Sequence, residues 1–332
     1  MNQLMKQVAG IAFASIAVFG MSTAAQAVEV KEVISDGGIR AWLIEDHMNP
    51  LMTMDIAFTG AGAATDPINK LGLANMVSGL IDEGAGAMDS QTFRGEMENR
   101  SISLSFDAGR DDFAGSLTTL TRERDTAIDL LRLALSEPRF DEEAVERIRS
   151  QIIAGLKRAE NDPGDIASRT FFKSIFGDHP YARPVSGTFE TVAGLNANDF
   201  RSFVGRAFAK DNLIIGVAGD ITAEELGPLL DEAFGSLPDH SDLPKIADVT
   251  PKFGAVDVID QDIPQSQAVW GQKGIARKDP DFYAAYVMNY ILGGGGFSSR
   301  LTEEVREKRG LAYGVYSYLA DLDHAQMMMG GV

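Results

Sequence analysis

The chain has 332 residues, 45% of them hydrophobic and 23% charged, enough for a sizeable core and, by length, for two domains. Its formal net charge of −18 argues against a nucleic-acid partner, because such binding needs clustered lysine and arginine. The absence of cysteine excludes disulfides, thiolate zinc sites and cysteine nucleophiles.

The first 27 residues have the pattern of an export signal. Lys6 is followed by an apolar run over residues 8–21 and then by the small-residue sequence Ala25-Gln26-Ala27. A membrane anchor is the competing interpretation, but glycine and serine interrupt the run and no basic flank follows it. We therefore predict cleavage before Val28, a periplasmic mature protein, and no transmembrane anchor after signal cleavage.

The first half of the chain predicts an α+β arrangement. The predicted elements, in chain order, are strands at 39–45 and 51–58, helices at 72–83 and 90–100, a strand at 102–106, helices at 123–135, 141–158 and 163–176, a strand at 212–219 and a helix at 222–234. Strands and helices come in runs with little strict alternation. This order favours α+β layers, with helices covering one face of a sheet, over a doubly wound sheet.

A similar order begins again after residues 237–254, a segment rich in proline and aspartate that has the composition of a linker. The predicted elements are strands at 256–259 and 266–272, a helix at 279–292, a glycine loop, a helix through Arg306 and a strand at 312–319. The echo indicates an internal duplication, although residue identity between the halves is weak. The predicted divisions are a signal peptide at 1–27, an N-terminal domain at 28–236, a linker at 237–254 and a C-terminal domain at 255–332, which we expect to be truncated.

The most distinctive stretch joins a glycine loop, Gly293-Gly294-Gly295-Gly296, to an Arg that precedes a Tyr by seven positions, Arg306 and Tyr313. From the residues alone, the loop is a flexible turn between two helices. Arg306 then pairs with nearby glutamates on a solvated helix face, and Tyr313 is a half-buried strand aromatic. A phosphate loop is disfavoured because no Gly-Lys-Ser or Gly-Lys-Thr follows.

Other polar groups give weaker signals. His179, in His-Pro-Tyr, is interpreted as a structural turn or core histidine. The acid pairs Asp82-Glu83 and Asp111-Asp112 are interpreted as solvated faces or caps and not as catalytic carboxylates. Ser78 lacks a Gly-x-Ser-x-Gly elbow and a nearby histidine, which argues against a serine nucleophile.

Several separated motifs in this order resemble the M16 peptidase family, the pitrilysin and mitochondrial-processing-peptidase group, especially its short bacterial members that work as two-chain assemblies. The motifs are Leu71-Gly72-Leu73-Ala74, Gly177-Asp178-His179-Pro180-Tyr181 with Gly187-Thr188, residues 213–220 and residues 293–313. The resemblance covers the chain from about Lys31 to its end. It implies two homologous α+β domains, each an antiparallel-rich sheet covered by helices. It also implies that Arg306 and Tyr313 hold a peptide against a zinc site, and that Gly293, Gly294, Gly295 and Gly296 form a substrate-recognition loop.

Catalytic members of the family carry His-x-x-Glu-His directly after the Gly-Leu-Ala segment, which supplies two zinc ligands and a general base. Here the three key positions of that motif are Asn75, Ser78 and Gly79, none of which supplies such a ligand or base. The helix expected to carry the distal glutamate ligand has Ala and Gly there. The closest two histidines lie 61 positions apart, so no shifted motif exists. We predict no catalytic residue and no metal in this chain.

The sequence and the resemblance together predict a non-catalytic subunit of a periplasmic zinc peptidase complex. The predicted partners are an M16-type homologue that bears the zinc and an extended peptide substrate, held in a shared cleft. The alternative is a peptide- or protein-binding scaffold of the cell envelope with no role in proteolysis. A neighbouring gene for an intact His-x-x-Glu-His homologue would favour the first prediction, and an isolated gene the second. An independently active hydrolase would need a metal site or nucleophile that the sequence lacks.

Overall fold

The computed structural model describes residues 29–332, and within it Lys31–Val332 forms one compact unit. The predicted signal peptide at 1–27 lies outside the described residues, so cleavage and export stay predictions. Between residues 29 and 332, no helix combines the length and the apolar character that a membrane crossing requires.

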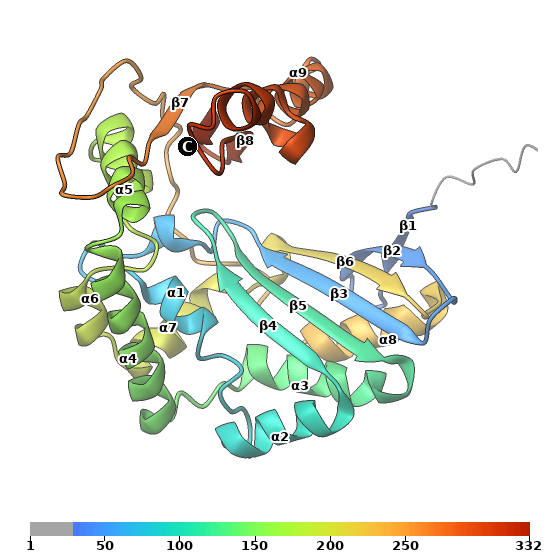
Figure 1. Cartoon of the computed structure of the whole chain (residues 1–332). Coiled ribbons are helices and arrows are strands. Elements are labelled where there is room, and N and C mark those ends of the chain that lie inside the picture. The colour runs from blue at the N-terminus through green and yellow to red at the C-terminus, as the bar shows by residue number, and fades with distance from the viewer. Residues whose placement is uncertain (1–28) are drawn as a thin grey trace, which may run out of the picture. The chain divides into compact units, whose positions relative to one another are not determined.

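A six-stranded sheet forms the first half, with strand order β1-β2-β6-β3-β5-β4 (Figure 1). Its strands are β1 (Lys31–Ile34), β2 (Arg40–Glu45), β3 (Leu51–Phe58), β4 (Ser103–Ala108), β5 (Phe113–Leu120) and β6 (Leu213–Gly219). Every neighbouring pair is antiparallel except β2 and β6. Along β3, buried side chains alternate with more exposed ones, as expected for a strand with one face on the core. The predicted antiparallel-rich sheet is confirmed.

Helices cover one face of this sheet, whereas α5 (Pro163–Phe176) contacts the strand at residues 269–273 of the second half. The other helices of the first half are α1 (Leu73–Ser78), α2 (Ser90–Arg100), α3 (Arg124–Ser136), α4 (Glu142–Ala159), α6 (Phe189–Gly194), α7 (Ala197–Ala207) and α8 (Ala223–Phe234). Figure 1 shows α3 and α8 side by side beneath the strands, and both contact the sheet. Aromatic rings fill the core between the layers, with the centroids of Phe58 and Phe208 4.4 Å apart and those of Phe113 and Phe208 4.9 Å apart.

The second half contains a three-stranded sheet of order β7-β9-β8. Its elements are β7 (Val269–Lys273), α9 (Phe282–Asn289), the π-helical segments Tyr290–Gly294 and Thr302–Glu307, β8 (Tyr316–Leu322) and β9 (Ala325–Gly331). In chain order, β7, β8 and β9 repeat β3, β4 and β5, and the spatial order β7-β9-β8 repeats β3-β5-β4. The α+β class and the two related domains are therefore confirmed.

Some predicted elements are wrong or misplaced. Residues 256–259 form no strand, and Val256 and Val258 are 87% and 85% exposed. An extended segment becomes a strand only when a neighbour satisfies its backbone groups, and among the described residues none pairs with this one. The helix predicted at 72–83 is α-helical only over Leu73–Ser78. Three strands, β1, β5 and β9, and two helices, α6 and α7, were not predicted at all.

The β8–β9 hairpin joins the second half to the first. The backbone N–H of Asp323 donates to the Asp111 carboxylate at 3.1 Å, and that of His324 donates to the Tyr181 hydroxyl at 3.0 Å. The buried Tyr181 hydroxyl donates in turn to Asp111. The prediction that the Asp111 pair is a solvated face or cap is therefore wrong, because this carboxylate holds two parts of the chain together.

The segment predicted as a linker contains no helix or strand but is not free of the rest of the chain. The backbone N–H of Val249 donates to the carbonyl of His324, and that of Lys252 to the carbonyl of Ile175. A ring nitrogen of His179 lies 2.9 Å from the carbonyl oxygen of Ala247, which gives this histidine the structural role predicted for it. The domain boundaries at 236 and 254 stay predictions.

Candidate functional site

The segment after the glycine loop brings Arg306 and Tyr313 together. Arg306 lies in the π-helical segment Thr302–Glu307, and its guanidinium carbon is 4.7 Å from the centroid of the Tyr313 ring. The same carbon is 4.8 Å from the centroid of Phe297, so two aromatic rings contact one cation. Nη1 of Arg306 also donates to the Tyr313 backbone carbonyl at 3.2 Å. The sequence analysis did not identify Phe297 as a site residue, although it directly follows the glycine loop.

The site is open to solvent. Tyr313 is 87% exposed and Phe297 is 77% exposed, whereas the Arg306 side chain is only 28% exposed. The interpretation of Tyr313 as a half-buried strand aromatic is therefore wrong. Arg306 does pair with a glutamate as expected, since its Nε lies 3.2 Å from Glu307. Among residues 29–332, no protein group hydrogen-bonds the Tyr313 hydroxyl, which leaves a donor at the surface for a ligand.

Acidic side chains near Arg306 are neutralised by other cations. Glu304 accepts from Lys308 at 2.8 Å and from Arg309 at 2.6 Å. These hydrogen bonds, with Lys308 the larger influence, lower the pKa of Glu304 to about 2. Lys308 also pairs with Glu303 at 2.8 Å. Competition for the Arg306 guanidinium therefore comes mainly from Glu307, and the planar cation keeps hydrogen-bonding capacity for a carbonyl or an anion.

Two glycines of the loop are required by close packing. A Cβ atom at Gly293 would lie 2.5 Å from the Oγ of Ser317 on β8. A Cβ atom at Gly294 would lie 2.6 Å from the side-chain nitrogen of Asn289. Ser317 Oγ donates to Asn289 Oδ1 at 2.8 Å, so this buried hydrogen bond fixes the surface on which the loop lies.

The other two glycines have conformational or steric reasons of their own. Gly296 has a φ of +58°, a left-handed conformation that favours glycine. A Cβ atom at Gly295 would lie 2.7 Å from the carbonyl oxygen of Tyr290. The loop is thus a close-packed turn and not a flexible one, and it sets where Phe297 enters the site. A role of these four glycines in substrate recognition stays a prediction.

The degenerate zinc-motif positions lie on α1. The Oγ of Ser78 donates to the backbone carbonyl of Asn75 at 2.9 Å, a local bond within the helix. Gly79 ends this helix, and a Cβ atom there would lie 3.2 Å from Ile148 of α4. The helix is therefore tightly packed against α4 at the position where the resemblance leads one to expect a zinc ligand in catalytic members. Across residues 29–332, no three histidine, aspartate or glutamate side chains gather in a group that could hold a metal.

Two buried carboxylates near α1 have structural partners. Asp66 accepts hydrogen bonds from the backbone N–H groups of Gly72, Leu73 and Ala74, at 3.0, 2.9 and 3.2 Å. Its burial outweighs these three bonds and raises its pKa to about 7. The sequence signal was present but unused, because Asp-Pro before Gly-Leu-Ala is typical of a turn that leads into a helix.

Glu83 corrects another prediction. Its carboxylate is buried, with 1% of the residue exposed, and it bonds both Arg94 of α2 and Arg147 of α4. It is therefore neither a solvated face nor a cap, and the two guanidinium groups account for its charge.

Comparison with protein-family models gives two matches, one after the other along the chain. The insulinase (peptidase family M16) model matches residues 44–189, and the peptidase M16 inactive domain model matches residues 194–330. The two models together span most of the chain, in the order that the motifs indicated.

Curated relatives include a protein named as a non-peptidase and proteins named as uncharacterized zinc proteases. The non-peptidase homolog YmxG of Helicobacter pylori is 29% identical over 273 residues, which cover 82% of this chain and 63% of that protein. An uncharacterized zinc protease of Streptomyces coelicolor is 36% identical over 203 residues, covering 58% of this chain and 43% of that protein. The chain thus spans less than two thirds of the length of either relative.

Solved structures agree on the fold. A peptidase M16 inactive domain from Pseudomonas fluorescens matches with a TM-score of 0.80 at 27% identity, over 91% of this chain and 74% of that chain. A protease from Helicobacter pylori matches with a TM-score of 0.78 at 19% identity, over 92% of this chain and 75% of that chain, a likeness of fold alone. The matched models, the relatives and the two related sheets lead to one conclusion: the chain belongs to the M16 peptidase family.

Proposed function

We propose that this protein is a non-catalytic subunit of a periplasmic M16-type zinc peptidase complex. In this complex it contributes Arg306 and Tyr313 to a cleft shared with a zinc-bearing partner and helps to enclose an extended peptide. The observation that carries the proposal is the combination of an exposed Tyr313 beside a partly buried Arg306 with an α1 that supplies neither zinc ligands nor a base.

The chemistry of the pair suits a peptide carbonyl. The Arg306 guanidinium and the Tyr313 hydroxyl both donate hydrogen bonds, and donors aimed at a carbonyl oxygen stabilise the negative charge that develops during hydrolysis. The zinc ion and the general base would come from the partner, since this chain has Asn, Ser and Gly at the motif positions. The second aromatic contact from Phe297 holds the guanidinium beside Tyr313.

The relatives support a non-catalytic role. The Helicobacter pylori relative is described as a non-peptidase homolog, and the Pseudomonas fluorescens structure as an inactive domain. The second candidate function is a binding scaffold of the cell envelope. The exposure of Phe297 and Tyr313 favours it, because a surface of exposed aromatic residues binds peptides without catalysing a reaction.

Arg306→Ala tests the proposal in a reconstituted complex with the zinc-bearing partner. We expect turnover of a fluorogenic peptide to fall by about 10²–10³-fold, as for loss of one oxyanion donor, while the two chains still co-elute. Arg309→Ala is the matched control, because this nearby exposed arginine bonds Glu304 and contacts neither aromatic ring. Unchanged turnover in the Arg306 variant would exclude the proposed role and favour the scaffold.

A further inference from the structure

Two buried hydroxyl groups join the loop that carries Phe297 to the segment that carries Arg306. Ser299 is fully buried and Thr302 is 6% exposed, whereas Phe297 is 77% exposed. The Oγ of Ser299 donates to Oγ1 of Thr302 at 3.0 Å, and Oγ1 of Thr302 donates to the backbone carbonyl of Gly296 at 3.0 Å. We call Ser299 and Thr302 the hydroxyl pair.

The hydroxyl pair acts on both sides of the Phe297–Arg306 contact. The carbonyl of Gly296 belongs to the peptide group that leads into Phe297, and it accepts a second hydrogen bond from the N–H of Ser299 at 3.1 Å. Thr302 stands about one turn before Arg306 in the same π-helical segment. The pair therefore fixes the position of the loop relative to the turn that carries the cation.

The guanidinium of Arg306 has one nitrogen left for a ligand. Its Nε lies 3.2 Å from Glu307, and its Nη1 donates to the Tyr313 carbonyl at 3.2 Å. Within residues 29–332, no protein group hydrogen-bonds Nη2, so this nitrogen is the one that can donate to a peptide carbonyl. Because the Phe297 and Tyr313 rings hold the cation, the direction of Nη2 depends on where Phe297 lies.

We propose that Ser299 and Thr302 are positioning residues, which set through Phe297 the direction in which Nη2 of Arg306 meets a peptide carbonyl. This inference rests on the proposed function, in which Arg306 donates to the substrate. Both hydroxyls are buried, so they act through Phe297 and Arg306 and not on the peptide itself. A donor that is aimed in advance needs no reorganisation during the reaction, and a misplacement of about 1 Å can cost about 10²-fold in rate.

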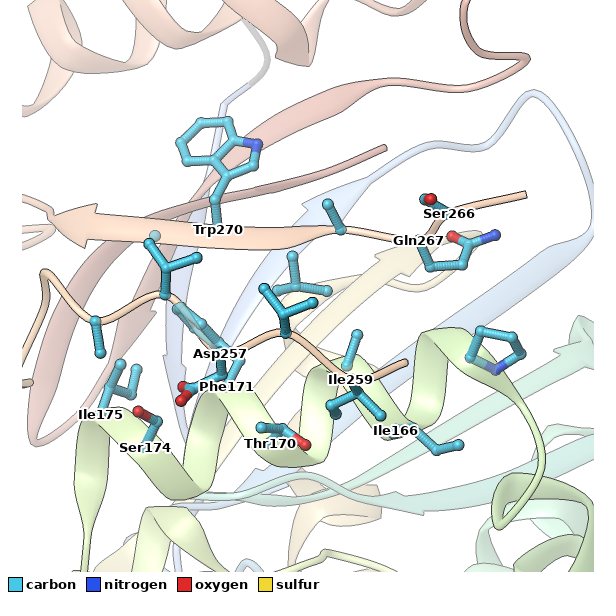
Figure 2. A pocket seen from close by; sticks show the side chains of 18 of the residues that line it. Ile166, Thr170, Phe171, Ser174, Ile175, Asp257, Ile259, Ser266, Gln267 and Trp270 are labelled. Atoms are coloured by element: carbon cyan, nitrogen blue, oxygen red, sulfur yellow. The ribbon is translucent and has the colours of Figure 1, made fainter. Parts of the chain in front are cut away.

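The cavity that Figure 2 shows beside α5 has no part in this arrangement. Its volume is about 640 Å³, its lining includes Ile166, Phe171 and Trp270, and none of residues 296–313 lines it. A substitution in the hydroxyl pair therefore leaves the lining of this cavity unaltered.

Thr302→Val tests the inference in the reconstituted complex, because valine has nearly the shape of threonine without its hydroxyl. We expect kcat for the fluorogenic peptide to fall by about 10–100-fold with little change in KM, since the transition state depends most on the aim of the donor. Thr302→Ser keeps the hydroxyl and should keep the turnover of the unaltered complex. In the Arg306→Ala background, Thr302→Val should cause no further loss, because the two residues act as one unit.

Thr65→Val is the matched control for a loss of stability. Thr65 is also buried, and its Oγ1 donates to the backbone carbonyl of another glycine, Gly62, at 2.8 Å, in the first half of the chain. This variant loses the same kind of hydrogen bond without touching the site. It should lower the melting temperature as Thr302→Val does and leave kcat unchanged.

NMR of the arginine side chains tests the positioning without any partner. The Nε–Hε signal of Arg306 lies beside two aromatic rings, whose ring currents displace it from the signals of exposed arginines. We expect this displacement to shrink in Thr302→Val and in Phe297→Leu, and to persist in Thr302→Ser.

The outcomes separate this inference from the proposed function. Unchanged kcat in Thr302→Val, while Arg306→Ala loses turnover, would overturn the inference and leave the proposed function standing. An equal loss of kcat in Thr65→Val, or an Arg306 signal that Thr302→Val does not move, would overturn it as well. Unchanged turnover in Arg306→Ala would overturn the proposed function, and this inference with it.

Discussion

At Gly293 the glycine loop touches β8 so closely that no side chain fits, since an added Cβ would lie 2.6 Å from the backbone nitrogen of Ser317. We expect Gly293→Ala to lower the free energy of unfolding by about 1–3 kcal/mol, the usual cost of overpacking. Chemical denaturation measures this change. Gly205→Ala is the control, because this helical glycine has no atom within 4 Å of its would-be Cβ and alanine favours helix by up to about 1 kcal/mol. Equal effects at both sites would contradict the packing argument.

Individual residues differ in how far the sequence predicts them. Arg306 and Tyr313 follow from the motif spacing, and Asn75, Ser78 and Gly79 from their position after Gly-Leu-Ala. The contacts that these residues make in the fold cannot be predicted from the sequence. Tyr313 is of a residue type that is common in strands. It nevertheless lies outside any strand and is exposed, because β8 begins only at Tyr316.

Elements with complete local signals are predicted residue for residue. The bounds of α2 and α5 match because an aspartate directly before each helix accepts a backbone N–H of its first turn, as Asp89 does from Thr92 and Asp162 from Asp165. Other elements depend on neighbours distant in sequence. The strand β5 was missed because glycine, serine and threonine dilute its apolar pattern, and only its pairing with β3 and β4 makes it a strand.

The buried carboxylate of Asp66 accepts the backbone hydrogen bonds at the start of α1. Its raised pKa predicts that the stability of the protein depends on pH. The pKa of Asp66 in the folded protein is raised by burial to about 7, above its ordinary value of 3.8. Between these two values the folded state holds a proton that the unfolded chain has released, so this group lowers stability as pH rises. Asp66→Asn does not titrate. Relative to the unaltered protein, the variant should therefore gain a few kcal/mol of stability between about pH 4 and pH 7, at about 1.4 kcal/mol per unit of pKa.

Denaturant unfolding of both proteins at several pH values measures this gain. Parallel stability curves would show that Asp66 keeps its ordinary pKa, and that its three backbone hydrogen bonds outweigh its burial. If the variant instead became less stable than the unaltered protein with rising pH, the folded state would stabilise the ionised carboxylate of Asp66, and its pKa would be lowered on folding.

At the scale of the whole molecule, the sequence predicts the internal duplication, but it does not predict the contacts between the two halves. Composition and element order are repeated along the chain, so two related sheets were expected and found. The junction at Tyr181, Asp111 and the β8–β9 turn joins residues more than a hundred positions apart, and no local pattern indicates it.

The central claim is that the chain acts only with a zinc-bearing partner. Affinity purification of the protein from its own cells, followed by a peptide-cleavage assay before and after treatment with a zinc chelator, tests it most directly. The account predicts that a homologue with an intact His-x-x-Glu-His motif co-purifies, and that the chelator abolishes cleavage and added zinc restores it. A protein recovered alone and inert, or one that cleaves peptides without any partner, would contradict the account.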